Sequence, residues 1–232
     1  MAQSDIDAST PKHLQDKYAI AGIGETTYTR GSGRSTRALA CWAISNAIKD
    51  AGMTPADVDG MLSYSSNDST FSPVIAGDLG IRPNFFMDVH GGGSSTEALI
   101  GIAIGVIEAG MCNAVVAFRA MNGYSEVRIG GTGARSAVPV TGDALHERAY
   151  GWQSAGQRFG PTFMRHMYDY GTTPEQVAAV KVAHSKHASN NPKAYYKKRY
   201  TVDDVVGSRF ICKPLHLLDC CVETDNATAI II

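Results

Sequence analysis

Three consecutive glycines stand between a histidine and two serines in the segment HGGGSS, residues 90–95. A glycine-rich turn ahead of a helix exposes backbone N–H groups and the positive end of the helix dipole, which stabilise a developing oxyanion. A histidine beside such a turn can give or take a proton near neutral pH. The segment therefore predicts an oxyanion-binding turn built from Gly92, Gly93 and Ser94, with His90 as acid or base. The alternative is a tight strand-to-helix turn that a serine caps and whose backbone binds the His90 ring.

A second group of residues has the chemistry of a phosphate site. The basic residues Lys197, Lys198 and Arg199 follow Tyr195 and Tyr196 directly. Basic side chains with aromatic neighbours hold an adenine nucleotide by charge and by stacking. Because the whole chain has a formal charge of −1, the field that attracts nucleic acids is missing, and the phosphates of coenzyme A are favoured over RNA. A merely solvated face is the alternative.

Two further sets of side chains can contact a substrate. Tyr124 follows an expected strand and can donate a hydrogen bond in a pocket, or it can face solvent. The segment 142–170 carries large apolar side chains, among them Trp152, Phe159 and Met164. Together they offer enough apolar surface to cover a lipid or steroid ring system, and ordinary packing onto the sheet is the alternative.

Other motifs carry less chemistry. His184 and His187 share an expected helix face, but no carboxylate or cysteine stands at ligand spacing, so we expect no metal site. Gly22 and Gly24 follow an expected strand, yet the third glycine of a dinucleotide fingerprint is replaced by Thr27, which argues against NAD. The five cysteines are odd in number and lie mostly in apolar segments, so reduced thiols are expected.

Expected strands and helices alternate along the first half of the chain. Strands are expected at 18–22, 58–64, 84–89 and 113–120, and helices at 36–50, 72–80 and 94–110. Such alternation predicts a largely parallel sheet that helices cover on both sides, an α/β fold.

The pattern changes after residue 120. One clear helix is expected there, opening at Thr173 as cap with Pro174 in the first helical position and Gln176 completing a capping box. Strand character returns at 228–232, where the chain ends inside an apolar run, as a fragment would. We therefore expect a disordered tail at 1–17, an α/β core at 18–120, an inserted loop domain at 121–217, and the last core strand within 218–232.

The composition bounds these assignments. A chain of 232 residues with 44% hydrophobic and 19% charged residues forms one large globular domain or one domain with an insertion. The first 17 residues lack the apolar stretch of a secretory signal, and the longest apolar run, residues 98–107, is half the length that spans a bilayer. A cytoplasmic protein without a membrane span is expected.

Four stretches together resemble the thiolase superfamily, and most of all its lipid-transfer branch, related to sterol-carrier-type thiolases. They are AIAGIGETTYTR, HGGGSSTEALIGIAIGVIEAG, YGTTPEQVAAVKVAHSKHASNNPKAYY and SRFICKPLHLLDCCVETDNATAIII. The resemblance covers nearly everything from Tyr18 to Ile232 and is that of an N-terminal half. It implies a layered αβα domain with a mostly parallel mixed sheet, and an inserted loop domain that covers the active site. The resemblance thus implies that segment 142–170 is the substrate lid.

Gly92 is the most informative departure from that family. Thiolases carry a cysteine at the matching position and use it as the acyl acceptor, and glycine offers no nucleophile. Members of the resembled branch that lack this cysteine include aldolases of steroid side-chain breakdown. The resemblance therefore implies retro-aldol cleavage of a β-hydroxy steroid acyl-CoA to a ketosteroid and propionyl-CoA.

The resemblance also implies the partners of the reaction. Coenzyme A enters as part of the substrate, and no permanently bound cofactor is expected. A homodimer and a small OB-fold acyl-CoA-binding protein are the implied protein partners, and the main proton-transfer residue is expected beyond Ile232. The competing hypothesis is a catalytically inactive thiolase-like subunit that binds acyl-CoA or serves as a scaffold.

Overall fold

The computed structural model describes residues 12–65, 69–126, 128, 142–152 and 154–232. The chain divides into two compact units. The core unit comprises residues 1–26, 34–121 and 227–232, and the inserted unit comprises residues 27–33 and 122–226. The inserted unit thus reaches Asn226, beyond the expected insertion 121–217, and it includes Thr27–Gly33. Residues 1–11 of the expected tail lie outside the described residues, whereas Lys12–Leu14 form a 3₁₀ turn.

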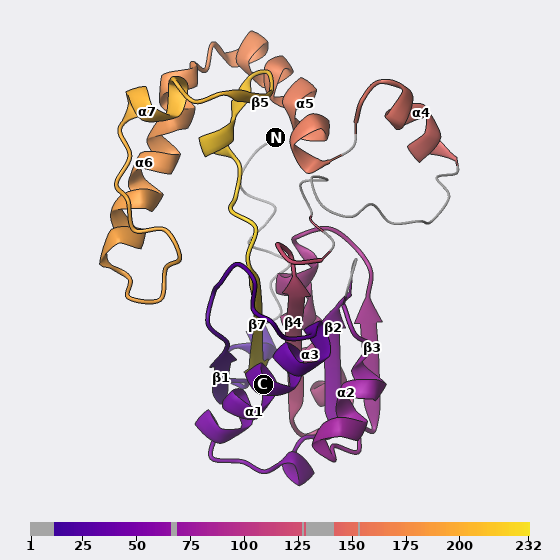
Figure 1. The fold of residues 1–232 in the computed structure, drawn as a ribbon. Coiled ribbons are helices and arrows are strands. Elements are labelled where there is room, and N and C mark those ends of the chain that lie inside the picture. The colour runs from indigo at the N-terminus through magenta and orange to yellow at the C-terminus, as the bar shows by residue number, and fades with distance from the viewer. Residues whose placement is uncertain (1–11, 66–68, 127, 129–141, 153) are drawn as a thin grey trace. The chain divides into compact units, whose positions relative to one another are not determined.

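The core unit is a five-stranded sheet with strand order β1-β7-β4-β2-β3 (Figure 1). Its strands are β1 (Gly22–Glu25), β2 (Gly60–Tyr64), β3 (Phe85–Val89), β4 (Val115–Asn122) and β7 (Asp225–Ile231). β2 pairs in parallel with both β3 and β4, and β1 pairs antiparallel with β7. The fold is therefore α/β with a mixed sheet, as the sequence predicted.

Helices cover both faces of this sheet, and strand periodicity decides which side chains they meet. Met61 and Val116 pack on one face with α1 (Thr36–Asp50) and α2 (Ser72–Leu79). Leu62 and Val115, one residue away, pack on the other face with α3 (Ser95–Glu108). Because neighbouring strand residues point to opposite faces, one uninterrupted apolar strand serves two apolar layers. The result is the expected αβα arrangement.

The first strand begins at Gly22, so the prediction of a strand at 18–22 was wrong. Gly22 and Gly24 lie against α1, where an added Cβ would overlap the backbone of Ala47 and Ala43. The Gly-Ile-Gly sequence therefore serves close packing of strand and helix. The other core elements were expected within a few residues of their observed ends.

The inserted unit is mostly helical. It contains α4 (Asp143–Ala149), α5 (Ala155–Tyr170), α6 (Pro174–Asn190), α7 (Val202–Val206) and a small sheet of β5 (Phe210–Cys212) and β6 (Leu215–His216). α6 begins as predicted, because Thr173 accepts from the Gln176 N–H at 3.4 Å and Gln176 accepts from the Thr173 N–H at 2.9 Å. The sequence predicted α6 alone, so α4, α5 and α7 correct that expectation.

Candidate active site

The glycine-rich turn joins the end of β3 to the start of α3 in the core unit. The His90 Nδ1 lies 3.0 Å from the Ser65 carbonyl oxygen. A carbonyl only accepts, so Nδ1 donates, and in the neutral ring the lone pair is then on Nε2. The side chain is exposed. The loop backbone thus orients the His90 ring while leaving it in the tautomer that a base requires.

Gly92 stands in open space. An added Cβ would meet no atom within 4 Å, whereas one at Gly91 would overlap the Ser95 hydroxyl. The Ser95 N–H bonds back to the Gly92 carbonyl at 3.0 Å and closes the turn. The backbone of Gly92 therefore has room for a side chain, and the missing nucleophile is not a consequence of crowding.

Ser94 occupies the N-cap position of α3 without making a side-chain cap bond. Thr96 instead bonds the Gly93 carbonyl through its hydroxyl at 2.8 Å. The Ser94 side chain is exposed. The alternative, in which Ser94 or Ser95 caps this helix, therefore does not hold for Ser94, whose hydroxyl makes no cap bond.

A cavity of about 230 Å³ adjoins the first turn of α3 within the core unit. Thr96 and Glu97 line it from the helix, and Arg119 lines it from β4. The remaining lining is largely apolar and comes from α3, β4 and β7. The cavity thus places a few polar side chains in a mostly apolar lining near the glycine-rich turn, although it is smaller than the roughly 300 to 1,000 Å³ of ordinary ligand pockets.

Tyr124 lies in the inserted unit, where a buried carboxylate fixes its loop. Asp225 is completely buried and accepts from the N–H groups of Tyr124 and Ser125 at 3.0 Å and from those of Gly31 and Ser32 at 2.9 Å. The Ser125 hydroxyl also donates to Asp225. Burial alone would raise the pKa of Asp225, but these hydrogen bonds outweigh it and lower the pKa below its ordinary value.

The predicted lid residues lie on and before α5 in the inserted unit. Trp152 is half-buried ahead of the helix, and on the helix Phe159 and Met164 are 65% and 47% exposed. Phe159 lines a groove of about 460 Å³ with Thr162, Phe163, His166, Val177 and Leu215. Gly160 is the residue of α5 that is buried. A Cβ added at Gly160 would lie only 2.8 Å from the Cys212 sulfur, so the helix packs closely there. This helix therefore keeps most of its apolar face open.

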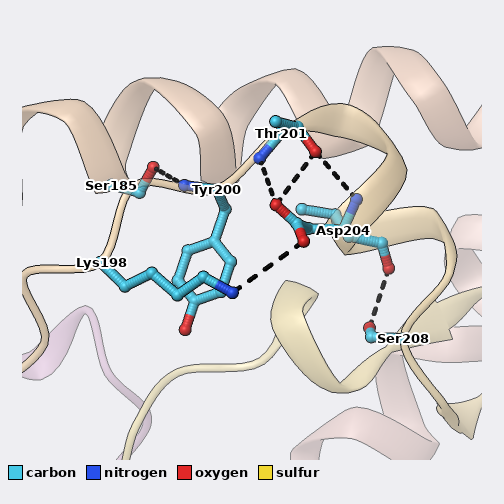
Figure 2. A network of polar contacts seen from close by, with 7 residues as sticks. Ser185, Lys198, Tyr200, Thr201, Asp204 and Ser208 are labelled. Atoms are coloured by element: carbon cyan, nitrogen blue, oxygen red, sulfur yellow. Dashed lines mark hydrogen bonds and ion pairs between the residues drawn. The ribbon is translucent and has the colours of Figure 1, made fainter.

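Two of the three predicted phosphate-binding side chains engage neighbouring parts of the inserted unit. Figure 2 shows the Lys198 ammonium over the Tyr200 ring, 4.9 Å from its centre, and 4.0 Å from the Asp204 carboxylate. The Arg199 Nε donates to the Ser189 hydroxyl at 2.9 Å at the end of α6. Lys197 is exposed. Lys198 and Arg199 thus already have anionic or polar partners.

The structure divides the predicted site residues between the two units. His90, Gly92 and Ser94 share one turn of the core unit, and the remaining predicted residues lie in the inserted unit. Sequence reasoning missed Arg30 and Asp225. Arg30 lies over the rings of Tyr124, Tyr195 and Tyr196. The one available signal was an aspartate at the start of the last strand.

The described residues form few other groupings with the potential for chemistry. In the described part of the chain, no group of three histidine, cysteine or acidic side chains could hold a metal ion. The five cysteines are free thiols. None of the helices with described residues is long and apolar enough to cross a membrane.

Comparison with known proteins gives clear relatives. The chain is 38% identical over 224 residues to a 17-hydroxy-3-oxo-4-pregnene-20-carboxyl-CoA lyase of Mycobacterium tuberculosis, covering 94% of this chain and 58% of that protein. It is 37% identical to a steroid side-chain-cleaving aldolase of Thermomonospora curvata, covering 92% of this chain and 56% of the relative. The chain thus spans little more than half the length of these curated relatives. No protein-family model matches it.

Solved structures agree with these relatives. The structure titled Ltp2-ChsH2(DUF35) aldolase superposes with a TM-score of 0.82 at 35% identity, covering 92% of this chain and 54% of that one. A thiolase-like protein of Mycobacterium smegmatis, at 21% identity and a TM-score of 0.68, shares the fold. The chain is therefore similar over most of its length to steroid side-chain-cleaving aldolases, thiolases and sterol carrier protein 2, and it has the fold of thiolase-like structures.

Proposed function

We propose that this protein is a thiolase-like acyl-CoA lyase that cleaves a β-hydroxy steroid side-chain CoA thioester to a ketosteroid and propionyl-CoA. The observation that carries the proposal is Gly92, which stands in the nucleophile position of the resembled thiolases and has open space where a cysteine would fit. Two relatives that match over most of this chain bear the names of a steroid acyl-CoA lyase and a steroid side-chain-cleaving aldolase. Retro-aldol cleavage needs no acyl-enzyme, so the missing thiol is compatible with it.

The reaction requires two proton transfers and the stabilisation of one anion. A base takes the proton of the β-hydroxyl, the bond between Cα and Cβ breaks, and its electron pair becomes the thioester enolate while Cβ becomes the ketone carbon. An acid then protonates Cα and gives propionyl-CoA. The N–H groups at Gly92, Gly93 and Ser94, with the positive end of α3, would hold the enolate oxygen. His90 would transfer a proton beside that oxygen.

The inserted unit would bind the rest of the substrate. Trp152, Phe159 and Met164 would contact the steroid rings, and the groove that Phe159 lines offers apolar surface for them. Tyr124 would donate a hydrogen bond to the substrate. Lys197, Lys198 and Arg199 would line the path of the coenzyme A phosphates. Coenzyme A would enter only as part of the substrate, with no permanently bound cofactor.

The proposal extends to partners and location. The matching structure is titled as an aldolase with a DUF35 component. We propose that this protein likewise works with a small OB-fold, acyl-CoA-binding partner, as a homodimer in the cytoplasm.

The test is incubation of the full-length protein, with any co-purified partner, with a β-hydroxy steroid acyl-CoA, followed by mass spectrometry. Release of propionyl-CoA together with the matching ketosteroid is expected. Binding of the substrate without cleavage would instead support the inactive acyl-CoA-binding subunit.

The variant Gly92→Cys gives a second test of the same site. Because the added side chain meets open space, the protein should fold normally, and thiolytic or hydrolytic activity toward acyl-CoA should appear while aldol cleavage does not improve. Gly101→Ala, on the exposed face of α3, is the matched control, because its added methyl also meets open space. Faster aldol cleavage by Gly92→Cys would contradict the proposed use of this turn.

A further inference from the structure

Five side chains from distant parts of the sequence gather in the inserted unit and form what we call the arginine–tyrosine cluster: Arg30, Tyr124, Arg128, Tyr195 and Tyr196. The guanidinium carbon of Arg30 lies 4.7 Å from the centre of the Tyr124 ring, 5.8 Å from that of Tyr195 and 5.7 Å from that of Tyr196. The Arg128 guanidinium lies 4.2 Å from the Tyr124 ring centre. Two cations therefore share one aromatic ring.

Hydrogen bonds hold these side chains in place. Asp225 binds the N–H groups of the residues that follow Arg30 and also the N–H of Tyr124, so one carboxylate ties both loops together. The Arg30 Nε donates to the Glu223 carbonyl at 3.1 Å, and the Arg128 Nε donates to the Tyr124 carbonyl at 2.8 Å. The cluster is thus preorganised, which lowers the entropy lost when a ligand binds.

The cluster is also open to solvent. Tyr195 and Tyr196 are 40% and 44% exposed, and their rings lie edge to face with centres 4.8 Å apart. Arg30, Tyr124 and Arg128 are half-buried. A guanidinium group is positively charged and weakly hydrated, which suits it to an anionic ligand. Arginine is the residue that binds phosphate through two parallel N–H donors, and tyrosine faces stack on nucleobases.

We propose that the arginine–tyrosine cluster binds the adenosine 3′-phosphate end of coenzyme A, an inference that rests on the proposed acyl-CoA lyase function. Arg30 and Arg128 supply the positive charge for the phosphates, and Tyr195 and Tyr196 supply the stacking surface for the adenine. Lys198 and Arg199, which face Asp204 and the end of α6, contribute less than the sequence predicted.

The test compares two substrates of the full-length enzyme. One is the β-hydroxy steroid CoA thioester, and the other is the same acyl group on pantetheine, which lacks the adenosine and its phosphates. Arg30→Gln should raise KM for the CoA thioester about tenfold and leave kcat, and all constants for the pantetheine thioester, nearly unchanged. Arg165→Gln is the matched control, because it removes an exposed positive charge from α5 in the same unit and should alter neither substrate.

The outcomes separate binding from folding. Equal losses on both substrates would show that Arg30 only supports the structure and would overturn the proposal. A loss found in Lys198→Gln but absent in Arg30→Gln would overturn it as well. If Arg30→Gln does not fold, the exposed pair Tyr195→Ser and Tyr196→Ser provides the same comparison, with an expected rise of KM of about fivefold for the CoA thioester alone.

A direct binding measurement keeps this proposal separable from the lyase function. Adenosine 3′,5′-bisphosphate should bind the full-length wild-type protein in calorimetry, and Arg30→Gln should weaken that binding about tenfold. If the bisphosphate binds in a way that depends on Arg30 but the protein cleaves no acyl-CoA, the proposed binding site stands and the proposed lyase function is wrong. If the protein cleaves acyl-CoA but its binding of the bisphosphate does not depend on Arg30, the proposed lyase function stands and the proposed binding site is wrong.

Discussion

The core unit and the inserted unit are stabilised in different ways. In the core unit, apolar side chains such as Ile44, Met61 and Leu62 are completely buried between helices and sheet. In the inserted unit, Ala178 and Val205 are the buried apolar side chains among its described residues. Polar groups replace them there, above all the buried Asp225 with its hydrogen bonds and the capping boxes of α6 and α7.

The difference shows how one chain combines a rigid scaffold with an open binding surface. Burial of a large apolar side chain contributes about 1.5 to 3 kcal/mol, so the core unit obtains its stability from many similar contributions. The inserted unit leaves Phe159, Tyr168 and Tyr170 more than half exposed, and each specific hydrogen bond therefore accounts for a larger share of its stability. Exposed aromatic surface on such a unit is available for a substrate or a partner.

The largest effect should come from Asp225→Ala. The substitution removes the acceptor of the N–H groups of Gly31, Ser32, Tyr124 and Ser125. At about 1 kcal/mol for each of these part-buried hydrogen bonds, the loss is about 4 kcal/mol. We expect faster limited proteolysis of the inserted unit and a lower free energy of unfolding in urea. An effect below about 1 kcal/mol would contradict the role of this carboxylate as the anchor of the unit.

The variant Asp225→Asn tests the same carboxylate through the pH dependence of stability. The pKa of Asp225 is lower in the folded state than its ordinary value, so its contribution to stability is complete above about pH 4, the unfolded pKa, and is lost as pH falls through the folded pKa. The stability difference between wild type and Asp225→Asn should therefore shrink below about pH 4. Asp59→Asn in the core unit is the matched control, because half-buried Asp59 accepts from Asn113 and Ala114 and also has a lowered pKa. Asp59→Asn should lower the free energy of unfolding by less than Asp225→Asn does at every pH.

A steric change should have the next largest effect, this time in the core unit. Gly24→Ala places a methyl group where the Ala43 carbonyl oxygen lies, and β1 must move away from α1, at a cost of about 2 to 3 kcal/mol. Gly101→Ala, which meets no atom within 4 Å on α3, should instead stabilise the protein by about 0.5 to 1 kcal/mol through helix propensity. Thermal melting of both variants checks this. Equal melting temperatures would show that close packing of β1 on α1 does not contribute to stability.

The same difference between the units explains what the sequence could predict. Alternating strands and helices were recognised in the core unit because their apolar patterns reflect burial on two faces of a sheet. In the inserted unit, α6 was recognised from its capping box at Thr173, while α5 was missed. α5 carries Pro161 inside it. A proline inside a helical pattern usually ends or kinks the helix, so the segment was not recognised as a helix although its apolar residues recur at helical spacing.

The candidate site was predictable only where its residues are neighbours in sequence. His90, Gly92 and Ser94 lie in one turn, and their common position followed from the strand and helix around it. The contact of Arg30 with Tyr124 joins residues far apart in the chain through Asp225, and no local pattern reports such a contact. Sequence reasoning therefore identified Tyr195 and Tyr196 as an aromatic surface but paired them with the adjacent basic residues instead of Arg30.

The smallest expected changes in the free energy of unfolding come from two helix N-termini, one in each unit. Thr173→Ala removes the side-chain bond that caps α6 and should lower the free energy of unfolding by about 1 kcal/mol. Ser94→Ala at the start of α3 removes a hydroxyl that makes no cap bond, so its effect on urea unfolding should stay within about 0.3 kcal/mol. If both variants behave in this way, the hydroxyl of Ser94 does not contribute to folding of the helix that begins at the proposed oxyanion site. A cost at Ser94 equal to that at Thr173 would instead make Ser94 an ordinary cap, and the turn would lose one argument for a role in catalysis.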